Sequence, residues 1–246
     1  MWLDPFFSNH WLQDLVATLL SFITAFLWLL LVEALSDRKV LSSDLSRKLT
    51  HIGTGPIFVL TWNLFSNHQS APFLASLVPL ALTLRFAVIG LGLVDDPAVV
   101  QSLSRTGDRR EILRGPLYYG LVFIVATAVF WRHSPIGILS LMLMCGGDGL
   151  ADVIGRRWGK QKIPFSPGKS WVGSAAMFVG SFVFGYAYLL LFNLFGNFTP
   201  ALNISSTAFS VALISVAATF VEMLPIKDID NLTTTMTAIL LGLLLF

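Results

Sequence analysis

Long apolar stretches recur along this chain, and they constrain its fold more than any other feature. Of its 246 residues 55% are hydrophobic and 12% are charged, against roughly 25% charged residues in soluble domains. A helix that crosses a bilayer needs roughly 17–25 apolar residues, and an isolated strand cannot cross because its backbone groups would lack partners. The sequence therefore predicts an all-α polytopic membrane bundle of about eight transmembrane helices, with seven to nine as the range. The spans are expected near residues 14–35, 51–66, 71–94, 116–131, 135–154, 171–196, 206–224 and 231–246.

Basic residues are concentrated in the loops between alternate spans. Of the 16 Lys and Arg residues, 14 fall in four such loops, whereas Arg132 lies on the other side and Arg85 within a span. The positive-inside rule places these four loops in the cytoplasm and both termini outside. We therefore expect one integral membrane domain, residues 1–246, whose cytoplasmic catalytic loops lie near 36–50, 95–115, 155–170 and 225–231.

Two carboxylates, Asp148 and Asp152, follow the uncharged run 135–145 inside a predicted span. Ionisable groups at membrane depth are costly, so such a pair indicates a functional site. At a spacing of four residues both side chains leave the same face of a helix, where they repel each other unless a cation lies between them. A hard divalent ion such as Mg²⁺ that also binds a phosphate suits this arrangement. The alternative is that the two acids hydrogen-bond neighbouring helices.

The loop after Asp152 combines basic residues with glycines and prolines. Gly168, Lys169 and Ser170 match the end of a phosphate-binding P-loop, but that motif needs a preceding strand and a glycine five positions before Gly168, where Ile163 stands. We therefore reject the P-loop interpretation. Lys169 and Ser170 still precede a predicted helix whose N-terminal amides favour an anion, which indicates a nucleotide phosphate. A simple helix cap by Ser170 is the alternative.

The first two cytoplasmic loops carry further candidates for phosphate binding. Arg47, Lys48 and His51 lie within one helical turn, where His51 could contact a phosphate or accept a proton from a substrate hydroxyl. A hydrogen bond within the core is the alternative for this histidine. In the second loop Arg105 and Arg114 are candidates for binding anionic oxygens, because a guanidinium offers a planar fork to phosphate. The residues between them fit a solvated salt-bridge face equally well: Asp108, Arg109 and Glu111.

Other ionisable residues lie in or beside the spans. Glu222 falls inside a predicted span and forms a second intramembrane carboxylate site. Asp230 and Asn231 stand at the start of the last predicted helix, where they could cap it or complete a metal and nucleotide site. Arg85 would be costly facing lipid, so we expect it to face the bundle and pair with a carboxylate such as Glu33 or with a ligand phosphate. Snorkelling of Arg85 to the interface is the alternative.

Four motifs stand out beside these single residues: Arg47-Lys48-x-x-His51-x-Gly53-x-Gly55, Gly147-Asp148-Gly149-x-Ala151-Asp152-x-x-Gly155-Arg156-Arg157-x-Gly159, Lys169-Ser170-Trp171-x-Gly173-Ser174 and Asp230-Asn231-Leu232. Together they resemble the polyprenol kinase family, and within it the CTP-using phytol kinases. The likeness covers roughly residues 33–240 and extends to farnesol kinase and, more remotely, to dolichol kinase and CDP-diacylglycerol synthase. Family members often have a proline after Asp-Asn-Leu, whereas this chain has Thr233-Thr234-Thr235-Met236.

This resemblance implies transfer of the γ-phosphoryl group of CTP, or of UTP or ATP, to an isoprenoid alcohol such as phytol. Mg²⁺ is the implied cofactor, and phytyl phosphate for tocopherol-type synthesis is the implied product. Catalytic roles are expected of Asp148, Asp152 and His51, with the two aspartates as metal ligands. Nucleotide binding is expected of a larger set: Arg47, Lys48, Arg105, Arg114, Gly147, Gly149, Gly155, Arg156, Lys160, Lys169, Ser170, Asp230 and Asn231.

The expected partners are the lipid bilayer, a prenyl alcohol and a nucleotide, with no nucleic acid and with a homodimer left open. Residues 1–13 contain no Lys or Arg, so we expect no signal or transit peptide. This favours a bacterial membrane of the cyanobacterial type, with the active site facing the cytoplasm.

Two other functions would use similar residues. A cytidylyltransferase acting on a lipid phosphate, similar to CDP-diacylglycerol synthase, would release pyrophosphate instead of CDP. An ion-coupled transporter should show inverted repeats and should place its acids near the midplane of the membrane. The sequence shows no such repeat, and Asp152 and Asp230 are expected near the cytoplasmic edge. We therefore expect a membrane-embedded kinase.

Overall fold

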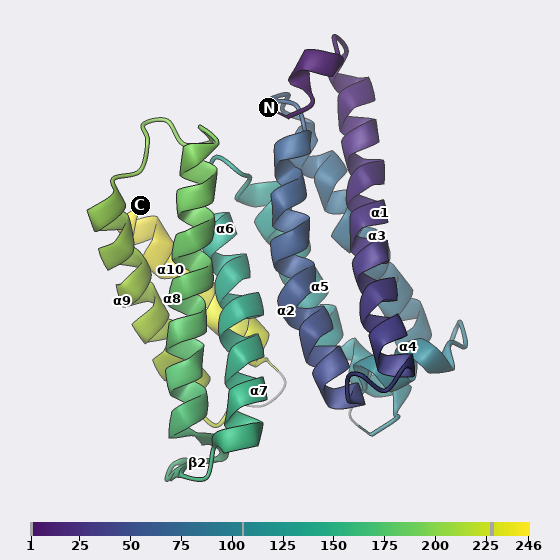
Figure 1. The fold of residues 1–246 in the computed structure, drawn as a ribbon, viewed down its shortest axis with the longest axis vertical. Coiled ribbons are helices and arrows are strands. Elements are labelled where there is room, and N and C mark those ends of the chain that lie inside the picture. Colours follow the sequence, from purple (N-terminus) through teal and green to yellow (C-terminus); the bar gives the residue numbers. More distant parts are fainter. Residues whose placement is uncertain (1, 105, 227–228) are drawn as a thin grey trace. The chain divides into compact units, whose positions relative to one another are not determined.

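The computed structural model describes residues 2–104, 106–226 and 229–246, and most of them are helical. The chain divides into two compact units, one up to Val129 and one from Phe130 to Phe246, which are described separately (Figure 1). The expectation of one domain over the whole chain stays a prediction.

The first unit contains four long helices and several short ones: η1 (Asp4–Phe6), α1 (His10–Asp37), α2 (Ser43–Thr61), η2 (Trp62–Leu64), α3 (Ala71–Gly90), α4 (Pro97–Leu103), η3 (Arg109–Leu113) and α5 (Gly115–Val129). Helix α1 packs against α2 and α3, and α3 packs against α5. Asn9 caps α1, because its side chain accepts hydrogen bonds from the Trp11 and Leu12 amides. Asp14 in α1 is fully buried, and its carboxylate accepts hydrogen bonds from the Ser66 amide (2.7 Å) and hydroxyl (3.0 Å).

The second unit is built around a central helical segment with a hairpin at its end: α6 (Pro135–Met142), the π-helix η4 (Leu143–Asp148), α7 (Gly149–Trp158), β1 (Lys162–Ile163), β2 (Ser166–Ser170), α8 (Trp171–Leu194), α9 (Ile204–Glu222) and α10 (Asp230–Leu245). Helix α8 packs along α6, η4 and α7, while α9 packs against α8 and α10, and α10 also against α6. The uncharged run that begins at Pro135 forms the core, in which Ile138, Leu143 and Cys145 are fully buried. A Cβ atom at Gly180 of α8 would come within 2.5 Å of the Gly146 carbonyl oxygen, so this glycine permits the close approach of α8 to η4.

The prediction of an all-α polytopic membrane bundle is confirmed. Each of the eight expected stretches is helical, and among the described residues six helices are long and apolar enough to cross a membrane: His10–Ser36, Ala71–Gly90, Arg109–Val129, Pro135–Trp158, Trp171–Leu194 and Ile204–Glu222. Helix α10 is shorter at 16 residues, and α2 begins eight residues before the expected span, with Arg47 and Lys48 in its first two turns. The count of eight spans therefore stays a prediction.

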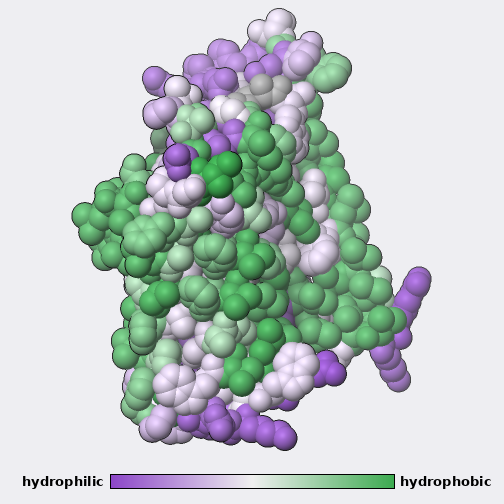
Figure 2. All heavy atoms as spheres, turned by 60° about the vertical axis from the view of Figure 1, so that its left-hand side comes forward, coloured by the Kyte–Doolittle hydropathy of each residue, from purple (hydrophilic) through white to green (hydrophobic). Residues whose placement is uncertain are grey.

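Large apolar side chains are exposed along the long helices, as expected of helices that contact lipid. On α1 they recur at positions such as Leu15, Leu19, Phe26 and Leu27. Figure 2 shows one face of the molecule, on which hydrophobic side chains fill the middle and hydrophilic ones gather mainly toward the top and bottom. This distribution fits a bilayer as the surrounding solvent.

Candidate functional site

A π-helical turn positions Asp148 and Asp152 in the second unit. The helical segment that begins at Pro135 widens into π geometry over the six residues of η4, which ends at Asp148, and Asp152 follows in the first turn of α7. π-Helical turns are rare, and they occur frequently at functional sites. The two carboxylates thus lie one turn apart where the regular hydrogen-bond ladder changes. Their spacing predicts the shared helix, whereas nothing in the sequence indicated the π turn itself.

Asp152 is paired with the first basic residue of the loop that follows it. The Arg156 Nε atom donates a hydrogen bond to Asp152 Oδ1 at 2.8 Å, one helical turn away, and both side chains remain partly exposed. Exposed pairs of this kind contribute little to stability. Their consequence is positional, because the guanidinium of Arg156 lies beside the expected metal ligand.

A largely buried ion pair joins Lys169 of β2 to Glu222 at the end of α9. The Lys169 Nζ and Glu222 Oε1 atoms are 2.6 Å apart, and the side chains are only 19% and 9% exposed. Asp148 and Asp230 also interact electrostatically with Glu222. The structure therefore brings together charged residues from η4, β2, α9 and α10. The hairpin that carries Lys169 lies between α7 and α8 in the chain (Figure 1).

Glu222 is the site residue that the sequence analysis did not assign to nucleotide or metal binding. The sequence feature that pointed to Glu222 was a carboxylate inside an apolar span. The sequence could not show that its partner is Lys169, because the two residues are 53 positions apart.

Ser170 caps helix α8, which is the simple alternative to phosphate binding for this residue. Its Oγ atom accepts a hydrogen bond from the Gly173 amide at 3.2 Å. Two glycines allow other segments to pack closely against α8: a Cβ atom at Gly155 would lie 3.3 Å from Gly173 Cα, and one at Gly147 would clash with Ser181. Among the other residues expected to bind nucleotide, Gly149 begins α7 and Lys160 is exposed just after it.

Asp230 and Asn231 form the first turn of α10, and the described residue before them, Ile229, makes no side-chain cap. Instead their carbonyl oxygens accept hydrogen bonds from threonine hydroxyls one turn later, from Thr234 to Asp230 at 2.7 Å and from Thr235 to Asn231 at 2.6 Å. The threonine run that follows therefore continues the helix, and its hydroxyls bond back to the preceding turn.

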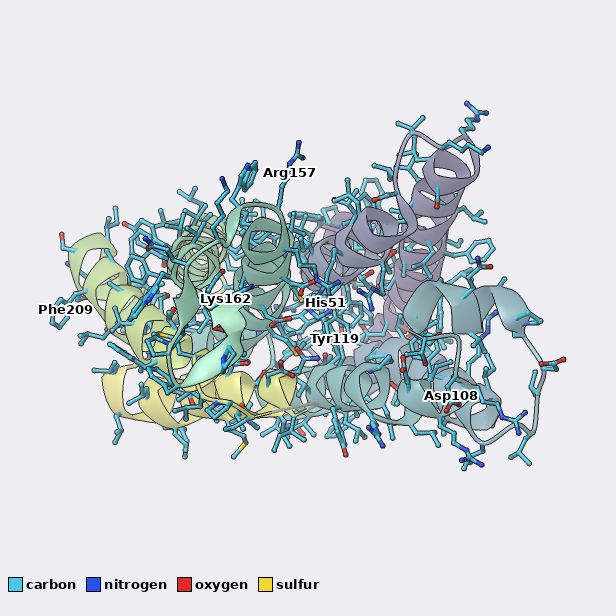
Figure 3. All side chains as sticks on the ribbon, turned by 90° about the horizontal axis from the view of Figure 1, so that it is seen from below. His51, Asp108, Tyr119, Arg157, Lys162 and Phe209 are labelled. Atoms are coloured by element: carbon cyan, nitrogen blue, oxygen red, sulfur yellow. The ribbon has the colours of Figure 1, made fainter. Side chains whose placement is uncertain are left out.

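In the first unit, His51 of α2 lies against Tyr119 of α5 (Figure 3). The two ring centroids are 4.5 Å apart, and the Tyr119 hydroxyl donates a hydrogen bond to the His51 carbonyl oxygen at 2.9 Å. Arg47 and Lys48, one turn earlier, are partly exposed. The sequence did not single out Tyr119 as a neighbour of His51, because that contact spans 68 positions.

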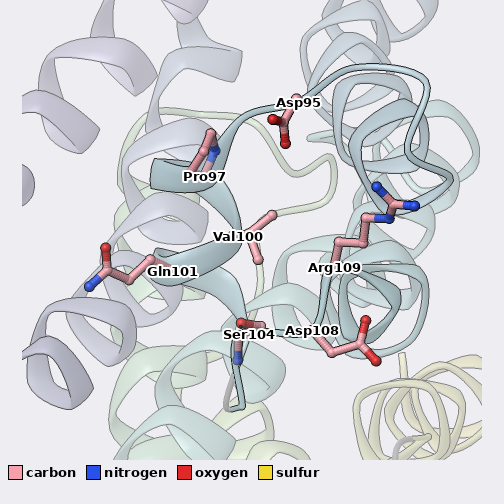
Figure 4. A pocket seen from close by; sticks show the side chains of 8 residues that line it. Asp95, Pro97, Val100, Gln101, Ser104, Asp108 and Arg109 are labelled. Carbon is pink, nitrogen blue, oxygen red and sulfur yellow. Dashed lines mark hydrogen bonds between the residues drawn. The ribbon is translucent and has the colours of Figure 1, made fainter.

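The second basic loop forms an open hollow of about 560 Å³ lined by Asp95, Pro97, Val100, Gln101, Ser104, Gly107, Asp108 and Arg109 (Figure 4). Two acids of this loop bond within it: Asp108 accepts from the Arg110 amide at 2.9 Å, and Glu111 from the Thr106 hydroxyl at 2.8 Å. This fits the alternative of a solvated polar face. Arg114 follows η3, and Arg105 lies outside the described residues.

The expectation that Arg85 faces the bundle is wrong. Its Nη2 atom binds Asp96 Oδ2 at 2.7 Å, and its side chain is 52% exposed. Arg85 lies near the end of α3, so its long side chain can reach the loop beyond, and pairing there avoids a charge in the core. The hydrogen bond from the guanidinium and those from the backbone amides hold the pKa of Asp96 below its ordinary value. The side chain of Glu33 lies outside what the structure describes.

The expected site residues thus fall into two groups, one in each unit. The first unit holds Arg47, Lys48, His51 and Arg114, and the second holds Gly147, Asp148, Gly149, Asp152, Gly155, Arg156, Lys160, Lys169, Ser170, Asp230 and Asn231. Among the described residues no three His, Cys, Asp or Glu side chains are grouped closely enough to hold a metal ion by themselves.

Comparison with known proteins gives close relatives over nearly the whole chain. A probable phytol kinase 1, chloroplastic, from Oryza sativa subsp. japonica is 42% identical over 96% of this chain and 75% of its own length. Phytol kinase 1, chloroplastic, from Arabidopsis thaliana is 41% identical over 97% of this chain and 79% of its own. A probable phytol kinase from Triticum aestivum is 43% identical over 96% and 78%. No family model and no solved structure matches the chain. With this identity over nearly its full length, the chain belongs to the phytol kinase family.

Proposed function

We propose that this protein is a membrane-embedded kinase that transfers the γ-phosphoryl group of CTP to the hydroxyl oxygen of phytol. A bond forms between that oxygen and the γ-phosphorus, the bond from the γ-phosphorus to the bridging β,γ-oxygen breaks, and the hydroxyl proton passes to a base, for which His51 is our candidate. The products are phytyl phosphate and CDP. The assignment of phytol as the substrate rests on relatives named phytol kinase, which align over nearly the whole chain. The same relatives do not favour a cytidylyltransferase or a transporter.

The carboxylates of Asp148 and Asp152 are suitable ligands for a Mg²⁺ ion that enters bound to a nucleotide. Mg²⁺ is usually held by one or two carboxylates, with water and substrate phosphates completing its six positions. Two carboxylates one turn apart at the end of a π segment supply that donor set, and a third protein ligand is not required. When bound, the ion would neutralise charge on the transferring phosphoryl group.

Basic side chains beside these acids would bind the phosphates. Lys169 lies just before α8, and Arg156 lies against Asp152. Phosphoryl transfer depends chiefly on positioning and charge neutralisation, so fixed cations at this point favour the reaction. Further candidates for nucleotide contacts are Asp230, Asn231, the partly exposed Arg47 and Lys48, and the exposed Arg114.

The alcohol would remain in the bilayer with its hydroxyl at the interface. His51 is our candidate for orienting that hydroxyl or accepting its proton, and Tyr119 supports the same part of α2 through its bond to the His51 carbonyl. The nucleotide would enter from the side that carries the basic loops, which in a cyanobacterial-type membrane is the cytoplasm. Phytyl phosphate would serve tocopherol-type synthesis.

An assay of the purified protein tests this function. The protein is incubated with Mg²⁺, a panel of CTP, UTP, ATP and GTP, and a panel of phytol, geranylgeraniol and farnesol, and the products are resolved by mass. We expect phytyl phosphate and CDP from phytol and CTP. Pyrophosphate with a CDP-lipid formed from phosphatidate would instead show a cytidylyltransferase, and turnover that does not need Mg²⁺ would refute the metal site.

A further inference from the structure

The ion pair between Lys169 and Glu222 differs from two other pairs in the protein by its burial. Arg85–Asp96 and Arg156–Asp152 each have an arginine side chain about half exposed, whereas the Lys169 and Glu222 side chains are 19% and 9% exposed. The pair also joins distant parts of the second unit, because Lys169 belongs to the hairpin strand β2 and Glu222 ends α9. Its geometry is therefore set by the fold and not by local sequence.

A lysine held at one N–H can still bind other groups. The ammonium has three donors, and the contact of 2.6 Å to Glu222 Oε1 uses one of them. The side chain retains 19% exposure, so it is accessible from outside the unit. Lysine otherwise has a flexible stem whose freedom must be lost when it binds a phosphate. A buried carboxylate partner removes much of that freedom in advance.

The surroundings of Glu222 make this role specific to Lys169. Three carboxylates interact there, those of Glu222, Asp148 and Asp230, and Lys169 is the cation bonded to Glu222. A triphosphate approaching these acids would be repelled unless cations faced it. The position of the Lys169 ammonium then decides whether a phosphate can be accommodated.

We propose that Glu222 is a positioning residue for nucleotide binding, which orients the Lys169 ammonium so that its remaining N–H groups meet the terminal phosphates. This inference rests on the proposed function, in which Lys169 binds phosphate. A merely structural role, in which the pair fastens the hairpin to α9, is the competing explanation. The two explanations differ in whether restoring opposite charges with the two residues exchanged also restores nucleotide binding.

A double-mutant cycle on nucleotide affinity first tests whether Glu222 acts through Lys169. The dissociation constant for CTP with Mg²⁺ is measured without alcohol, so that no turnover occurs, for the wild-type protein, E222Q, K169A and K169A/E222Q. We expect K169A to weaken binding about tenfold or more and E222Q about three- to tenfold, since charged pairs in contact couple strongly. In the K169A background E222Q should change affinity by less than about twofold, because no ammonium is left to orient.

The exchanged pair K169E/E222K separates positioning from fastening. It restores opposite charges between the hairpin and α9 but places the ammonium on the wrong element. A fastening role predicts that thermal stability and CTP binding both recover, whereas a positioning role predicts recovery of stability alone. K162Q is the matched control, because Lys162 is an exposed lysine of the same hairpin outside the proposed site. Melting temperatures of all variants in detergent show which of them fold.

The outcomes distinguish the inference from the function on which it rests. The positioning role would be overturned if the E222Q protein bound CTP as tightly as the wild type. It would also be overturned if the E222Q substitution weakened CTP binding equally with and without Lys169. Either result would leave the kinase assignment standing. Recovery of CTP affinity in the exchanged pair would also overturn the positioning role. A wild-type protein that binds no nucleoside triphosphate would overturn both.

Discussion

The two units each bury a carboxylate in a long helix, and they stabilise it in different ways. In the first unit Asp14 is fully buried and is bonded to the amide and hydroxyl of Ser66. In the second unit Glu222 is bonded to the ammonium of Lys169 and interacts with two further carboxylates. The neutral donors of Ser66, in the loop after η2, hold Asp14 in place as part of the fold. The ammonium beside Glu222 is instead a charged donor whose other N–H groups a ligand can accept.

Both acids lie inside apolar helices, yet only one of them is assigned to a binding site. Position alone marks both residues as functional candidates. The donors around each residue separate them, because a carboxylate satisfied by backbone and hydroxyl groups needs no ligand. Variants of the two units test this distinction, beginning with the largest expected effect.

Loss of either expected metal ligand should affect catalysis most. D148N and D152N should each lower Mg²⁺-dependent turnover by about 100-fold or more, because fixed charges at the transferring group dominate such reactions. Phytyl phosphate formation by membrane-inserted protein is the measurement, with R157Q as an exposed control outside the proposed site. Near-normal rates for both variants would remove these aspartates from the site.

D14N should show the opposite behaviour. The amide places an N–H group where the carboxylate accepts from Ser66, which should lower the free energy of unfolding by about 1–3 kcal/mol. Turnover per folded molecule should stay near that of the wild type. Thermal unfolding in detergent and the phosphorylation assay together decide this. A D14N protein of normal stability and impaired turnover would reverse the assignment of the two acids.

Y119F should have a smaller effect, confined to the first unit. It removes the hydroxyl that bonds to the His51 carbonyl, which should lower the free energy of unfolding by about 0.5–1.5 kcal/mol. If His51 orients the alcohol, the apparent KM for phytol should rise while that for CTP stays constant. A change confined to the KM for CTP would argue against this role.

The smallest effect is expected at the exposed pair Arg85–Asp96. The bond to Arg85 lowers the pKa of Asp96 in the folded protein below its ordinary value of 3.8, so its contribution to stability is present above that value. It is lost as the pH falls through the lowered pKa of the folded state. The difference in melting temperature between wild type and D96N should therefore shrink below about pH 4 and remain constant from about pH 5 to 7. A difference that grows on acidification would contradict the pairing.

Much of the fold could be predicted from the sequence, because backbone polar groups inside a bilayer must be hydrogen-bonded within the chain, which leaves few possible structures. Each apolar run became a helix, and Pro164 and Pro167 lie in the hairpin whose second strand leads into α8. The π turn at Asp148 was not predicted, since a change from four- to five-residue hydrogen bonding leaves the apolar pattern of 135–145 unaltered. Helix boundaries also moved, because α2 extends through its basic first turns.

The candidate site was predicted as a set of residues but not as a set of contacts. The spacing of Asp148 and Asp152 placed them on one helix, and the pair Asp152–Arg156 follows from the same periodicity. The pairings of Lys169 with Glu222 and of His51 with Tyr119 join elements far apart in sequence, which no local pattern encodes. Arg85 was misplaced because the sequence did not reveal that the loop after α3 brings Asp96 within reach.

Protection of single cysteines from a thiol reagent tests most directly whether the nucleotide binds beside the hairpin of the second unit. In a C145S background, Q161C places an exposed thiol just before the hairpin strand β1, and Q101C places one in the hollow of the first unit. Both are treated with a membrane-impermeant thiol reagent in oriented vesicles, with and without Mg²⁺ and CTP. We predict labelling of both only from the side of the basic loops, with protection by Mg²⁺ and CTP at Q161C alone. Labelling of Q161C from the opposite side, or its equal labelling with and without nucleotide, would contradict this account.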